Sequence, residues 1–95
     1  MLDLTQKNTL NIKLSKRKTL HILPPTKRLY DSLIALYNDP DNSDKVNEVV
    51  ASVLSNNTSH KNFKIKYVAK LHESDVTAIL EAYAEFINQI KQSPN

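Results

Sequence analysis

The fold is decided by the stretch SDVTAILEAYAEFINQIKQ, residues 74–92. Its apolar residues recur at the spacing of one helix face; they are Val76, Ile79, Leu80, Tyr83, Phe86, Ile87 and Ile90. The opposite face carries Asp75, Glu81 and Glu85. A helix with such a stripe must bury it against other elements to be stable. The pattern therefore predicts a long C-terminal helix, with a binding surface for a partner wherever part of the stripe stays uncovered.

The composition excludes several classes of protein. The chain has 95 residues, 40% of them hydrophobic, which suits one small domain spanning residues 1–95. It has no cysteine, so disulfide bonds and thiolate metal sites are excluded. It has no glycine, so the glycine-rich loops that cradle phosphates are absent. No apolar run is long enough for a membrane helix and residues 1–4 show no signal-peptide pattern, so we expect a soluble intracellular protein without a cofactor.

The charge alternates along the chain, although the net charge is only +3. Residues 1–28 and 61–71 are basic, whereas residues 29–60 and 72–95 are acidic. Such alternation suits attraction between subunits or to a protein partner as well as binding to nucleic acid.

The N-terminal third predicts a β-hairpin over residues 9–23. Leu10, Ile12 and Leu14 alternate with polar residues, and the alternation resumes at Leu20 and Ile22. The connection between them, residues 15–18, has no Asn-Gly or Asp-Gly pair. It therefore predicts a four-residue loop built on a type I turn.

The rest of the chain predicts helices, so the expected fold is α+β and mainly α: an N-terminal hairpin followed by three to four helices, the last one longest. The helices are expected at about 26–38, 43–55, 66–72 and 74–92, with an extended piece before the third and Ser93-Pro94 ending the fourth. The predicted core consists of Ile12, Leu14, Leu20, Ile22, Leu29, Leu33, Leu36, Val46, Val50, Val53, Leu54, Ile79, Leu80, Tyr83, Phe86, Ile87 and Ile90.

The sequence gives little support for catalysis or metal binding. The three histidines fall in separate segments, and no cysteine or serine nucleophile motif is present. Residues 39–44 resemble the start of a calcium loop, but Asp44 stands where the loop requires glycine and Val50 where it requires glutamate. We therefore expect a protein that is not an enzyme and holds no metal.

Two groups of residues are candidates for binding. Tyr30, Tyr37, Tyr83 and Phe86 lie on or beside apolar stripes. They predict either a groove for an amphipathic partner helix or aromatic side chains at the edge of the core.

The second group is the basic connection of the hairpin, Lys16, Arg17 and Lys18. These side chains could contact phosphates, although no aromatic residue lies among them for stacking on bases. A solvated turn is the alternative interpretation of the same residues.

The layout as a whole resembles a known family. The similarity is carried by Leu23-Pro24-Pro25-Thr26, the helix with Leu29, Leu33 and Leu36, the valine-rich helix ending in Val53-Leu54-Ser55-Asn56-Asn57, the segment Lys61–Val68, and Ala82-Tyr83-Ala84-Glu85-Phe86-Ile87 with the tail Ser93-Pro94-Asn95. The chain resembles, from about Leu10 to Asn95, the tail assembly chaperones of long-tailed, siphovirus-type bacteriophages of Gram-positive hosts.

The resemblance implies a non-enzymatic role. Proteins of this family bind the aggregation-prone tape measure protein in the host cell cytoplasm, keep it soluble until tail tube protein polymerises around it, and are not expected in the mature virion. The resemblance also implies a frameshifted longer form as a possible partner, and it is compatible with a homo-oligomer. Two other functions stay open: a small basic regulator that binds nucleic acid, and a self-assembling phage structural or connector protein.

Overall fold

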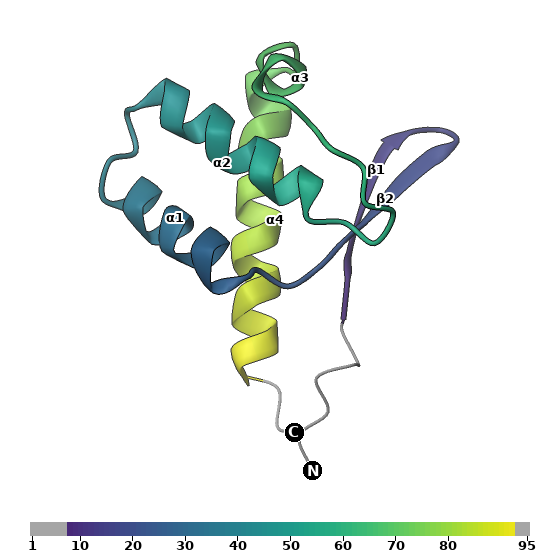
Figure 1. The fold of residues 1–95 in the computed structure, drawn as a ribbon, viewed down its shortest axis with the longest axis horizontal. Coiled ribbons are helices and arrows are strands. Elements are labelled where there is room, and N and C mark those ends of the chain that lie inside the picture. Colours follow the sequence, from purple (N-terminus) through teal and green to yellow (C-terminus); the bar gives the residue numbers. More distant parts are fainter. Residues whose placement is uncertain (1–7, 93–95) are drawn as a thin grey trace.

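The computed structural model describes residues 8–92 and confirms the predicted fold class (Figure 1). A two-stranded antiparallel hairpin precedes a set of helices, and the C-terminal helix is the longest. The elements are β1 Leu10–Ser15, β2 Lys18–Ile22, α1 Lys27–Tyr37, α2 Ser43–Ser55, α3 Ile65–Ala69 and α4 Glu73–Gln92. The predicted helix stop at Ser93-Pro94 and the segment 1–4 lie outside the described part.

The hairpin closes more tightly than predicted. Leu10 pairs with Ile22 and Ile12 with Leu20, but the register shifts at Leu14, so that Ser15 pairs with Lys18. The four-residue loop is therefore wrong: only residues 16 and 17 connect the strands, and neither has a positive φ. The extra residue on β1 is a bulge, which increases the local twist and lets the chain reverse without a glycine turn.

Helix α2 is the central element of the fold. It contacts α1, α3, α4 and β2, and Figure 1 shows it crossing α4. Its valines have a low helix propensity, because their branched side chains lose rotamer freedom in a helix. Packing offsets this cost, since Val49, Val50, Val53 and Leu54 are all buried.

The first residues of α1 and α2 are explained by the side chains that cap these helices. Thr26 Oγ1 accepts a hydrogen bond from the Leu29 amide (3.2 Å), and Asn42 Oδ1 accepts one from the Lys45 amide (3.2 Å). Each cap satisfies a backbone donor that has no partner within the helix. The first and second helices therefore begin one residue after these caps, at 27 and 43. The third helix is shorter than predicted, and the fourth begins one residue earlier.

The predicted core is largely confirmed. Twelve of the predicted side chains are buried, and Ile12, Leu14, Val46, Leu80 and Ile90 are partly buried against them. Further buried side chains come from Val49, Ala51, Phe63, Val68 and Val76.

The connection from α2 to α3 is organised around one buried polar side chain, Asn57. Its Nδ2 donates to the carbonyls of Leu54 (2.8 Å) and Lys61 (2.9 Å), and its Oδ1 accepts from the amides of Ser59 (3.0 Å) and Lys61 (3.1 Å). All its hydrogen-bonding capacity is thus used on the loop backbone. The turn also needs a left-handed residue, and His60 takes that conformation with φ 58° in a chain without glycine.

Within residues 8–92, no helix combines the length and the hydrophobicity needed to cross a membrane.

Candidate functional site

The four residues predicted to bind a partner do not share one surface. Tyr83 is fully enclosed and Phe86 is 6% exposed, whereas Tyr37 is 60% exposed at the end of α1. Tyr30 is half-buried against the core. The prediction that Tyr83 and Phe86 are offered to a partner is therefore wrong for the folded domain. Both side chains belong to the core that α4 forms with α2 and the hairpin.

The stripe of α4 leaves an apolar groove near its C-terminal end. This groove, a hollow of about 330 Å³, is lined by Pro24, Pro25, Thr26, Lys27, Tyr30, Ile87 and Ile90. Figure 1 shows where the segment between β2 and α1 passes across α4. The groove is the part of the structure where the end of the α4 stripe stays open to a ligand, and of the four predicted residues it contains only Tyr30.

A set of backbone contacts holds the proline wall of the groove in place. Asn56 Nδ2 donates to the carbonyls of Leu23 (3.2 Å) and Pro24 (3.0 Å), and the Leu23 amide donates to the Asn56 carbonyl (2.8 Å). Tyr83 Oη also donates to the Leu23 carbonyl (2.9 Å). The prolines themselves have fixed φ angles, so this wall is formed before any ligand binds. Tyr83 thus positions the groove from inside the core.

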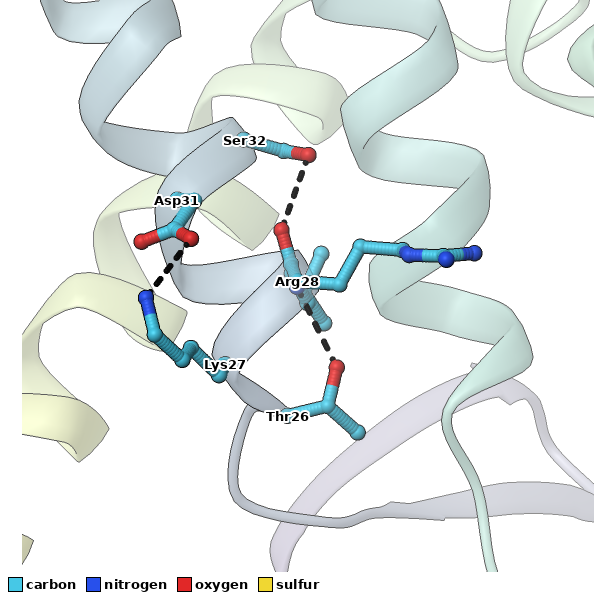
Figure 2. A network of polar contacts seen from close by, with 6 residues as sticks. Thr26, Lys27, Arg28, Asp31 and Ser32 are labelled. Atoms are coloured by element: carbon cyan, nitrogen blue, oxygen red, sulfur yellow. Dashed lines mark hydrogen bonds and ion pairs between the residues drawn. The ribbon is translucent and has the colours of Figure 1, made fainter.

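The first turn of α1 forms the polar margin of the groove (Figure 2). Lys27 Nζ lies 3.1 Å from Asp31 Oδ2, an exposed pair four residues apart on the helix. Ser32 Oγ donates to the Arg28 carbonyl (3.1 Å), and the Arg28 side chain extends toward α2. Exposed pairs of this kind contribute little to stability. Thr26 and Lys27 line the groove itself, and Arg28, Asp31 and Ser32 lie outside its lining.

Burial raises the pKa of Tyr83 from 10.0 to about 12, while a hydrogen bond with Asn56 acts in the opposite direction. The phenol is therefore a hydrogen-bond donor at all physiological pH values. It serves the structure by holding the Leu23 carbonyl.

We expect Tyr83→Phe to cost about 1 kcal/mol at neutral pH, because one hydrogen bond is lost while Asn56 still serves the Leu23 carbonyl. The pH dependence of the unfolding free energy above pH 10 is the sharper test of this hydrogen bond. Above pH 10 the unfolded wild-type chain releases the Tyr83 proton, whereas the folded protein keeps it until about pH 12. The free energy of unfolding should therefore fall across this window. Urea denaturation at several pH values should show a shallower fall for Tyr83→Phe; equal slopes would contradict the assignment.

The predicted phosphate contacts, Lys16, Arg17 and Lys18, are all exposed at the hairpin turn. The structure brings a further lysine, Lys61, next to Lys18, which sequence reasoning missed. The basic composition of residues 61–71 marks Lys61 as a candidate, but only the fold shows that this segment meets the hairpin turn.

No metal-binding cluster is found in the described part of the chain. Residues 8–92 contain no group of three histidine, aspartate or glutamate side chains that could hold a metal ion. The groove and the basic turn are surfaces suited to binding.

No family model, curated protein or solved structure matches this chain.

Proposed function

We propose that the protein is a non-enzymatic tail assembly chaperone that binds an amphipathic helix of the tape measure protein and keeps it soluble. The observation that carries the proposal is the groove at residues 24–27, 30, 87 and 90. A helix that lays its apolar face in a groove needs an apolar floor, a rigid wall and a polar margin. Ile87 and Ile90 supply the floor, the prolines supply the wall, and Lys27 lies at the margin.

The size of the groove suits a chaperone that is later displaced. A hollow of about 330 Å³ can take one or two side chains of a partner helix, not a long segment. A small contact of this kind gives weak, reversible binding, and many copies along a long helix can still cover it. The resemblance adds the rest of the proposal: action in the host cell cytoplasm, release when tail tube protein assembles, absence from the mature virion, and a frameshifted longer form or further copies of the chain as additional partners.

The test is co-expression with the tape measure candidate encoded beside its gene. We expect wild-type protein to keep that candidate soluble, and Ile90→Asp to lose this effect. A carboxylate in the apolar floor of the groove should weaken the binding of a labelled tape measure helix by about tenfold or more, since the bound helix would take the charge out of water. Fluorescence anisotropy measures the affinity.

Ile34→Asp is the matched control, because Ile34 is an exposed isoleucine on α1 outside the groove. It should bind within about twofold of wild type, in line with surface substitutions elsewhere. Circular dichroism of both variants is needed to check that they fold. If Ile90→Asp binds as well as wild type, the groove is not the binding site. If the protein alone forms large assemblies that the tape measure helix does not change, a structural phage protein becomes the better explanation.

A further inference from the structure

Two basic segments that lie more than forty residues apart in the sequence meet on one face of the molecule. The chain after α2 runs antiparallel to β2: Ile22 bridges to Asn57, and the Thr58 amide donates to the His21 carbonyl (3.0 Å). The turn that follows this bridge brings Lys61 next to Lys18. Lys18 Nζ lies 5.9 Å from the centre of the Phe63 ring, which confirms that the hairpin turn reaches this segment.

The meeting of the two segments produces a cationic surface. We call it the basic face; it is centred on Lys18 and Lys61, and the exposed residues Lys16, Arg17 and Lys64 adjoin it along the two segments. The Lys61 ammonium lowers the pKa of Lys18 by hydrogen bonding and charge repulsion. Like charges opposite each other destabilise a fold. Within residues 8–92 the ion pair found is Lys27–Asp31, on another element, and no carboxylate lies within ion-pair distance of the basic face.

Apolar surface lies directly beside these cations. A hollow of about 430 Å³ is lined by Glu48, Ala51, Ser52, Ser55, Asn62, Phe63, Lys64 and Ile65. Ile65 is 46% exposed and Tyr67 is 36% exposed, and Tyr67 packs edge-to-face on Phe63 with ring centres 5.0 Å apart. A ligand for this surface therefore has to offer both negative charge and apolar side chains.

We infer that the basic face and the adjoining hollow bind an acidic amphipathic helix of a partner protein. Carboxylates on one flank of such a helix would lie over Lys18 and Lys61, and its apolar side would cover Ile65. Glu48 at the margin of the hollow disfavours carboxylates there, which orients the helix. Nucleic acid fits less well, because its phosphates leave Ile65 uncovered and Phe63 is buried beneath Lys18 instead of open for stacking.

This surface is separate from the groove and shares no lining residue with it. The inference goes beyond the proposed function in assigning a second contact and its charge preference. It holds whether or not the groove binds a tape measure helix, and its test is independent of that partner.

The test uses three labelled probes: a designed amphipathic helical peptide with glutamates flanking a leucine stripe, the same peptide with lysines in place of the glutamates, and a short DNA duplex. Fluorescence anisotropy should show the acidic peptide binding at least about tenfold more tightly than the lysine peptide, and more tightly than the duplex. The double variant Lys18→Glu/Lys61→Glu should lose about tenfold in affinity for the acidic peptide, and Lys18→Gln/Lys61→Gln should lose part of it.

The matched control is Lys45→Glu, a charge reversal at the opposite end of α2, whose affinity should stay within about twofold of wild type. Ile90→Asp should also leave binding of the acidic peptide unchanged, which separates this surface from the groove. The inference is overturned if both peptides bind equally, if no probe binds, or if the double variant binds like wild type. Tighter binding of the duplex with the same dependence on Lys18 and Lys61 would overturn it in favour of a nucleic-acid interface.

Discussion

Asn57→Ala is expected to lower the free energy of unfolding by at least about 3 kcal/mol, because it leaves four backbone groups of the α2–α3 connection without their partner. Each buried polar group left unsatisfied costs about 1–3 kcal/mol. Water can reach some of these groups, but Asn57 itself is only 2% exposed, so alanine also leaves a cavity. Asn57→Asp should also destabilise, since a carboxylate would face two carbonyl oxygens in place of the amide. Urea denaturation with circular dichroism measures the change.

Asn88→Ala on the exposed side of α4 is the matched control, and its unfolding free energy should stay within about 0.5 kcal/mol of wild type. The position of the α2–α3 connection also explains why Asn57→Ala should affect more than the stability of the fold. Asn57 bridges to Ile22, and its side chain holds the turn that places Lys61 beside Lys18. Asn57→Ala should therefore disturb the basic face, and a wild-type unfolding free energy in this variant would contradict the role given to the side chain.

Periodicity was enough to predict the long C-terminal helix and the hairpin. The stripe from Val76 to Ile90 and the alternation from Leu10 to Ile22 each bury one face, so the pattern and the packing agree. The turns were harder, because their geometry depends on single residues. The bulge at Leu14 shortens the hairpin loop, and neither residue type nor spacing in this segment indicates it.

The sequence could not predict which segments far apart along the chain lie side by side in the fold. Asn57 reads as one residue of a polar loop, and only the fold shows that its amide is enclosed between α2 and β2. The meeting of Lys18 and Lys61 depends on the same contact. The basic segments could be recognised, but their position relative to each other is set by tertiary structure.

The sequence predicted an apolar binding site on the last helix, but it did not predict which residues line that site. A surplus apolar stripe was expected to offer Tyr83 and Phe86, yet α2 and the hairpin cover the middle of α4. What remains partly accessible is the end of the stripe, where Ile90 is partly buried and the edge of Ile87 lines the groove against Pro24 and Pro25. A stripe on one helix does not reveal which of its turns the neighbouring elements cover, because that depends on where they cross.

Phe86→Ala is expected to lower the free energy of unfolding by about 3–5 kcal/mol, the range observed for truncating a buried phenylalanine. The ring is 6% exposed and lies 6.0 Å from the Tyr83 ring between centres, with the planes inclined by 36°. Removing it leaves a cavity inside the core and takes away the aromatic neighbour of Tyr83. Urea denaturation should show the loss, and Glu85→Ala on the adjacent exposed position should change stability by less than about 0.5 kcal/mol.

This substitution also separates a core residue from a binding residue. If Phe86 acts through the core, the folded fraction of Phe86→Ala should bind a tape measure helix with the wild-type affinity, because the groove is lined by Ile87 and Ile90 and not by Phe86. Binding measured at low temperature, where most of the variant is folded, tests this point. A variant of normal stability that loses binding would instead place Phe86 at the partner surface, and would mean that the domain opens along α4 when it takes up its ligand.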